Sequence, residues 1–210
     1  MVNLPREPPP LTERFLAAVA LAEELHGRDR RSGTEIPYLA HLLVVTGLVI
    51  EDGGDEDEAI AALLHDAVED GGGRPLLERI ERSFGAAVAR LVESLSDTIE
   101  AVSNEPWIDR KVRYLDKLEH CDDESTLRIG LADKVHNARS IVRDYRATGP
   151  AIWERFAPIK TADQQLWYYG RLVDLFTRKR PGPLAEDLRV AVAELTALVA
   201  ADEDDGTPRS

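Results

Sequence analysis

The sequence has little of what marks several large classes of protein. Cys121 is the single cysteine among 210 residues, which excludes an internal disulfide and is typical of a reducing compartment. No apolar stretch is long enough, with suitable flanks, for a membrane span or a signal peptide. Lysine and arginine number 26 against 39 acidic residues, and the net charge of −13 argues against a nucleic-acid binder, which needs a basic face. We therefore expect a cytoplasmic protein that binds neither membranes nor nucleic acids.

Apolar residues instead recur at helical spacing along most of the chain, and no β-alternating segment of useful length interrupts them. With 43% hydrophobic residues the chain can bury one good core, so we expect an all-α, single-domain helical bundle over residues 11–201. Residues 1–10 are predicted to form an extended lead-in and residues 202–210 a disordered acidic tail. The expected helices lie at 11–26, 37–51, 56–70, 74–83, 85–97, 107–120, 123–147 and 184–201, with others in the aromatic-rich stretch between the last two.

The most informative feature is a polar pair in an otherwise apolar run. His65 and Asp66 interrupt the segment 59–68, which is apolar on every side of a helix. Burying an unpaired carboxylate is costly, so Asp66 must be paired, hydrogen-bonded or bound to a metal. A core hydrogen bond between His65 and Asp66 is the simpler explanation, and a metal ion would satisfy both side chains at once.

Two further segments carry polar residues of the same kind. His41 interrupts the apolar segment 38–50, and Asp133 lies with Asn137 and Ser140 on one helical face that borders an apolar stripe. Two imidazoles and two carboxylates suit a divalent cation such as Mn²⁺, Fe²⁺, Co²⁺ or Zn²⁺, with positions left open for water and substrate. The ligand types do not choose among these metals.

The order of these residues resembles the HD phosphohydrolase superfamily, and the flanking residues resemble its RelA/SpoT-type alarmone hydrolases. The matching blocks lie within about residues 15–145 and are Arg30-Arg31-Ser32-Gly33, Pro37-Tyr38 before His41, His65-Asp66 before Glu69-Asp70, and Leu131-Ala132-Asp133 before His136-Asn137. The resemblance implies an HD-type bundle with a buried metal site, in which His41, His65, Asp66 and Asp133 hold Mn²⁺ or another divalent transition metal. The chain lacks the length for the synthetase and regulatory domains of the family's long members, so it resembles the stand-alone small alarmone hydrolases. Beyond residue 147 the matching blocks fade, and residues of about 150–201 are predicted to form a helical extension.

The resemblance also implies the reaction. Such enzymes remove the 3′-pyrophosphate of guanosine tetraphosphate (ppGpp) or pentaphosphate, the alarmones of the stringent response. A divalent cation lowers the pKa of bound water and offsets charge on a phosphoryl oxygen. Glu69 and Asp70 would be the catalytic, proton-handling pair, because a helix through residue 70 turns one toward the His65 side and the other toward the Asp66 side. Alternatively, both only end a helix, although carboxylates there oppose its dipole.

Substrate contacts follow from the same resemblance but fit the family pattern less closely. The residues implied are Arg30, Arg31, Tyr38, Lys111, Asn137 and Ser140. The residues Thr34-Glu35-Ile36 lengthen the spacing between Gly33 and Pro37, so the arginines have two registers, and Arg31 fits both. A solvated basic loop would explain the arginines, and an ordinary charged helix start would explain Lys111. His26 is expected near the end of its helix, either at the surface or as a partner of the helix dipole.

The sequence thus predicts a Mn²⁺-dependent (p)ppGpp 3′-pyrophosphohydrolase whose partner is a small phosphorylated nucleotide. One alternative is an HD phosphohydrolase acting on another nucleotide, such as an adenine alarmone or a dinucleotide phosphate, because the lengthened loop would reshape the base pocket. The other is a nucleotide sensor without turnover. The aromatic-rich C-terminal half is compatible with a homo-oligomer.

Overall fold

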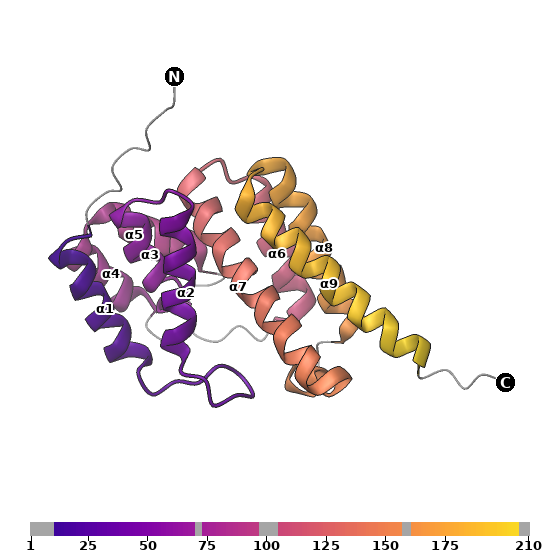
Figure 1. Cartoon of the computed structure of the whole chain (residues 1–210). Coiled ribbons are helices and arrows are strands. Elements are labelled where there is room, and N and C mark those ends of the chain that lie inside the picture. The colour runs from indigo at the N-terminus through magenta and orange to yellow at the C-terminus, as the bar shows by residue number, and fades with distance from the viewer. Residues whose placement is uncertain (1–10, 70–72, 97–104, 157–160, 206–210) are drawn as a thin grey trace, which may run out of the picture. The chain divides into compact units, whose positions relative to one another are not determined.

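A computed structural model describes residues 11–69, 73–96, 105–156 and 161–205, which are helical with connecting turns (Figure 1). No strand occurs in these ranges. Their β-type pairing is limited to one isolated antiparallel bridge between Arg30 and Pro37. Backbone contacts divide the chain into two compact units, one of Met1–Arg31 with Ile36–Ala101 and the other of Ser32–Glu35 with Val102–Ser210. The predicted all-α fold class is confirmed.

The first unit is built around one buried helix. Its elements are α1 (Glu13–His26), α2 (Tyr38–Glu51), α3 (Glu56–Leu63), α4 (Gly73–Phe84) and α5 (Ala86–Leu95). Helix α3 packs against α1, α2 and α5, and its residues 59–63 are fully buried. Asp55 and Glu58 form a capping box at its start, each accepting from the other's backbone N–H at 3.0 and 2.7 Å. The cap fixes where this central helix begins.

The predicted helix 56–70 is too long, because α3 ends at Leu63 and residues 64–67 form turns. The N–H groups of Leu64 and Ala67 bond to carbonyls three residues back, at 3.2 and 3.1 Å, so the helical ladder stops there. His65 Nδ1 lies 2.8 Å from the carbonyl oxygen of Ala62, one of the acceptors that a helix end leaves without a partner in the helix. Glu69 therefore does not lie on the same α-helix as the residues before His65, contrary to the prediction, and Asp70 lies outside the described residues.

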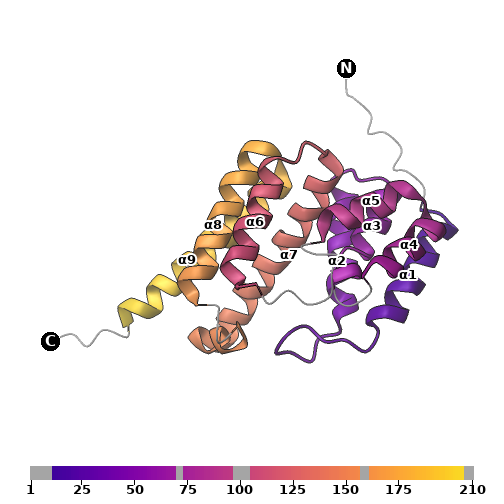
Figure 2. The ribbon, with the colours of Figure 1, turned by 180° about the vertical axis from the view of Figure 1, so that it is seen from behind.

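The second unit contains the longest helix of the described residues. Its elements are α6 (Trp107–Glu119), α7 (Glu124–Thr148), the 3₁₀ helix η2 (Gly149–Phe156), α8 (Ala162–Lys179) and α9 (Pro183–Asp205). Helix α9 packs on α7 and α8, and α6 packs on α8, as Figure 2 shows from behind. Asp123 caps the start of α7, and Gly149 ends it with a φ of 58°, a conformation that favours glycine.

The predicted ends of the chain differ from the structure at one boundary. Helix α9 continues through Asp205, whereas a disordered tail was expected from residue 202. The hydroxyl of Tyr145 donates to Asp202 Oδ2 at 2.8 Å. Asp202, predicted to lie in the acidic tail, is thus hydrogen-bonded to α7. Residues 206–210 and the lead-in 1–10 lie outside the described residues. That residues 11–201 form one domain stays a prediction, and none of the described helices is long and apolar enough to cross a membrane.

Candidate metal centre

The metal-ligating candidates of the first unit begin with His65, in the turn after α3. Its side chain is 5% exposed, and its Nδ1 faces the Ala62 carbonyl. A carbonyl oxygen only accepts, so Nδ1 carries the proton and Nε2 of the neutral ring presents a lone pair. That Nε2 lies 3.0 Å from Asp66 Oδ2. The turn therefore fixes the tautomer that a metal ligand requires.

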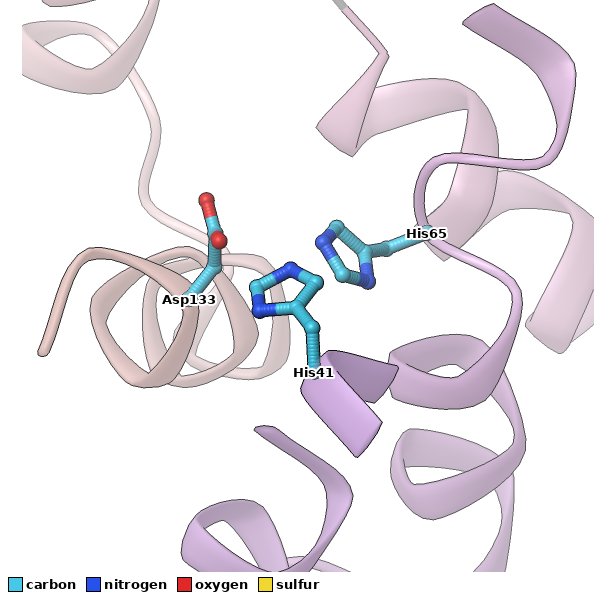
Figure 3. A group of neighbouring side chains, drawn as sticks. All are labelled: His41, His65 and Asp133. Atoms are coloured by element: carbon cyan, nitrogen blue, oxygen red, sulfur yellow. The ribbon is translucent and has the colours of Figure 1, made fainter. Parts of the chain in front are cut away.

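His41 comes from α2, one turn from its start, and is 2% exposed. Its Nε2 lies 3.6 Å from the same Asp66 oxygen. The imidazoles of His41 and His65 meet edge to face with centroids 5.3 Å apart, and a nitrogen of one lies within 4.8 Å of a nitrogen of the other (Figure 3). Two buried imidazole nitrogens thus converge on one carboxylate oxygen.

Asp66 is the shared partner, and its side chain is 25% exposed. Burial alone would raise the pKa of Asp66, but its electrostatic interaction with His65 and its hydrogen bond with His41 hold that pKa well below its usual range. The hydroxyl of Tyr38 donates to Asp66 Oδ2 as well. A lone pair of His65 beside an ionised carboxylate is repulsive unless a proton or a cation lies between them. This donor set fits a divalent cation.

Asp133 lies on α7 of the second unit, is 7% exposed, and is drawn in Figure 3. Both of its oxygens are held by its own helix: Asn137 Nδ2 donates to Oδ1 at 2.5 Å and Lys134 Nζ to Oδ2 at 2.6 Å. Lys134 also lies 4.8 Å from the centroid of the Tyr114 ring. Burial would lower the pKa of Lys134, but its interactions with Asp133, Tyr114 and Tyr168 together outweigh burial and raise that pKa well above its usual value. An ionised carboxylate is thus fixed in orientation.

The predicted substrate residues of the first unit lie in and after one closed loop. The backbone N–H of Arg31 donates to the Ile36 carbonyl at 2.9 Å, and that of Tyr38 to the Asp29 carbonyl at 2.9 Å. Arg30 Nη1 donates to the carbonyls of Arg28 and Asp29 at 3.3 and 3.2 Å, so its guanidinium ties the loop together.

Of the loop residues that lengthen the family spacing, Thr34 and Glu35 belong to the second unit together with Ser32 and Gly33, whereas Ile36 belongs to the first. Gly33 has a φ of 68°, and a Cβ placed on it would lie 2.5 Å from the Cγ of Arg155. A side chain at this position would meet both backbone strain and a clash.

Of the other predicted site residues, Glu69, Lys111 and Ser140 are described by the structure and Asp70 is not. Glu69 is half-buried and π-helical like Val68. In the second unit, Lys111 Nζ lies 5.4 Å from the centroid of the Tyr168 ring, and Ser140 is buried on α7.

The sequence missed two residues that contact these candidates. His26 lies in the last turn of α1, where a partner of the helix dipole was one expectation, but it is 3% exposed, so the alternative of a surface position is wrong. It falls four residues after Ala22 and eight after Ala18, on the buried stripe of α1, and this spacing could have revealed it. Lys134 likewise falls three residues after the buried Leu131, so it points inward despite its charge.

An open cleft of about 830 Å³ lies on the second unit, lined mainly by α6 and α8. Its walls include Val112 and Trp167, which are among the more exposed large apolar side chains of the described residues. The predicted site residues do not line it.

A helical scaffold that presents a His-Asp pair beside a second buried histidine defines a metal-binding hydrolase of the HD type. The model of the HD domain family matches residues 18–159. The chain belongs to this HD domain family.

Comparison with known proteins gives relatives over the same region. The guanosine-3′,5′-bis(diphosphate) 3′-pyrophosphohydrolase MESH1 of Xenopus tropicalis is 37% identical over 132 residues, which cover 61% of this chain and 70% of the relative. Human MESH1 is 34% identical over 133 residues, 62% of this chain and 70% of the relative. A GTP pyrophosphokinase of Streptomyces coelicolor is 36% identical over 125 residues, 59% of this chain but 14% of that enzyme.

The structure is also similar to a solved one, described as a metazoan ortholog of SpoT that hydrolyzes ppGpp and plays a role in starvation responses. The TM-score is 0.66 at 26% identity, and the alignment covers 89% of this chain and 95% of the other. The likeness therefore extends past residue 159, over more of the chain than the family model matches.

Proposed function

We propose that the chain is a divalent-metal-dependent hydrolase that removes the 3′-pyrophosphate of ppGpp or its pentaphosphate. The observation that carries this proposal is the convergence of His41 and His65 on Asp66 in a chain 37% identical to a named pyrophosphohydrolase of that substrate. Cytoplasmic location and self-association stay predictions.

The proposed metal ligands are His41, His65, Asp66 and Asp133, and the proposed metal is Mn²⁺. The orientation of His65, whose Nδ1 faces the Ala62 carbonyl, and the convergence of both imidazoles on Asp66 support this set, because ligands must offer lone pairs at neutral pH. Asp133 is included because both of its oxygens are oriented by donors and because of its place in the family order. When bound, a divalent cation lowers the pKa of a bound water and offsets charge on a phosphoryl oxygen.

Proton transfer is proposed for Glu69 and Asp70, which follow the ligand pair by a few residues. One carboxylate accepts a proton from the attacking water, and a carboxylic acid of the pair donates one to the departing ribose oxygen. The bond between phosphorus and the 3′ oxygen breaks, so ppGpp and water give GDP and pyrophosphate. The half-buried position of Glu69 supports its access to both water and the interior.

Nucleotide binding is proposed for Arg30, Arg31, Tyr38, Lys111, Asn137 and Ser140. The bonds of Tyr38 to Asp66 and of Asn137 to Asp133 indicate that these two also orient proposed metal ligands, whereas Arg30 ties its own loop together. Arg31 and Lys111 are proposed to supply positive charge to the polyphosphate, which a chain of net charge −13 must provide locally.

The test is product analysis across nucleotides. Protein freed of metal and resupplied with Mn²⁺ is incubated with ppGpp, with an adenine alarmone and with a dinucleotide phosphate, and the products are separated by ion-exchange chromatography. We expect GDP and pyrophosphate from ppGpp at the highest kcat/KM. Faster cleavage of either other substrate would favour the alternative that the lengthened loop around Gly33 suggests.

A further inference from the structure

His26, the last residue of α1, is buried although it ends a helix. Its Nδ1 lies 3.0 Å from Asp29 Oδ2. A carboxylate only accepts, so Nδ1 carries the proton, while the buried Nε2 has no hydrogen-bond partner among the described residues. A buried polar atom of this kind is destabilising, so core packing alone does not explain a histidine here.

The ring of His26 packs against Tyr38, with centroids 5.3 Å apart. Tyr38 also packs against His41, again with centroids 5.3 Å apart. The tyrosine ring thus contacts two imidazoles, and its backbone N–H donates to the Asp29 carbonyl at 2.9 Å. Asp29 therefore holds the side chain of His26 and the backbone of Tyr38 together.

The hydroxyl of Tyr38 donates to Asp66 Oδ2. Asp66 lies in a turn rather than in a helix, and a quarter of its side chain is exposed, so the backbone alone does not fix its carboxylate. The phenol occupies one lone pair of Oδ2 and thereby orients the remaining lone pairs.

We propose that His26 and Asp29 are positioning residues of the metal centre, which act by wedging Tyr38 so that its hydroxyl stays on Asp66. This inference rests on the proposed metal site and deepens it. It predicts that His26 matters for metal affinity only while the Tyr38 hydroxyl is present.

The experiment is a double-mutant cycle on Mn²⁺ affinity, followed by the electron paramagnetic resonance signal of free Mn²⁺. Loss of an outer partner of a metal ligand weakens binding about 10–100-fold, and we expect Tyr38→Phe and His26→Phe each to reach the lower part of that range. The double variant should bind like Tyr38→Phe alone. His120→Phe, at an exposed histidine that also bonds its own helix, is the matched control and should leave the affinity unchanged.

Asp29→Ala provides a second test of the same proposal, because the Asp29 side chain is 54% exposed and its removal leaves no cavity in the core. We expect a several-fold weaker Mn²⁺ affinity in the native background and no further loss in Tyr38→Phe. Effects of His26 and Tyr38 variants that multiply would overturn the proposal, as would a lower melting temperature of metal-free His26→Phe with unchanged affinity. Absence of Mn²⁺ binding by the unmutated protein would instead refute the metal centre itself.

Discussion

Replacing Lys134 by methionine removes the charge that holds Asp133 while keeping an unbranched side chain of similar length. The side chains of the pair are 14% and 10% exposed, so the carboxylate loses a nearly buried cation and keeps the Asn137 bond. A hydrogen bond to a charged group contributes about 1.5–3 kcal/mol, and breaking a fully buried ion pair costs about 3–5 kcal/mol. We therefore expect Lys134→Met to lower the free energy of unfolding by about 2.5 kcal/mol, which lowers the melting temperature of a chain this long by roughly 5–10 °C.

The assay is thermal unfolding of metal-free protein, repeated with saturating Mn²⁺. If Asp133 is a metal ligand, the cation compensates the uncovered carboxylate, and the difference between Lys134→Met and the unmutated protein shrinks. Lys117→Met, the same substitution at an exposed position of α6, should change stability by less than about 0.5 kcal/mol. A drop in melting temperature that is the same with and without Mn²⁺ would refute the reasoning.

The raised pKa of Lys134 also fixes how this effect depends on pH. A lysine whose folded pKa lies above its unfolded value contributes stability that is fully present below the unfolded pKa and is lost only as pH rises through the folded one. The destabilisation of Lys134→Met should therefore stay constant between about pH 6 and 9.

Three further predictions concern other residues. Asp70→Asn should keep nucleotide binding and lower turnover by about 100-fold or more, whereas a sensor would show no turnover in the unmutated protein; equilibrium binding and kcat are measured together. Arg31→Ala should raise KM for ppGpp about tenfold, and unchanged kinetics would mean that the base pocket is wrongly assigned. Burial alone would raise the pKa of Asp144, but its hydrogen bonds from Arg155 and Arg143 lower it, so Asp144→Asn should cost about 1 kcal/mol at pH 7. That difference should vanish as pH falls through the folded pKa, and a constant difference down to about pH 2 would contradict the assignment.

The helices of the chain were largely predictable because their apolar stripes are periodic and their ends carry caps. Helix α6 starts at Trp107, as expected after the Asn104-Glu105-Pro106 break, and α7 differs from its predicted range by one residue at each end. The end of α3 was not predictable from periodicity, because residues 59–64 are apolar throughout and offer no stripe whose loss could mark it. The signal was instead His65 itself, whose ring bonds the last turn.

The candidate ligands were predictable because buried imidazole and carboxylate groups stand out in apolar segments. The hydrogen-bond partners that orient these ligands were not predictable from such a pattern. Tyr38 and Asn137 were assigned to the nucleotide, whereas the structure bonds them to Asp66 and Asp133. Such bonds depend on side-chain direction at a turn or within one helix face, which residue order does not specify.

The division of the chain into two compact units was also not predicted from the sequence. Both halves consist of amphipathic helices of one period, so hydrophobic periodicity does not separate them, and residues 32–35 group with a unit far along the chain.

The central claim is tested most directly by pyrophosphate release from ppGpp, measured on metal-stripped protein before and after Mn²⁺ is restored, beside Asp66→Ala. The account predicts no release without metal, release on adding Mn²⁺, and no release from the variant at any Mn²⁺ concentration that saturates the unmutated protein. Release that continues without metal or in Asp66→Ala would contradict it.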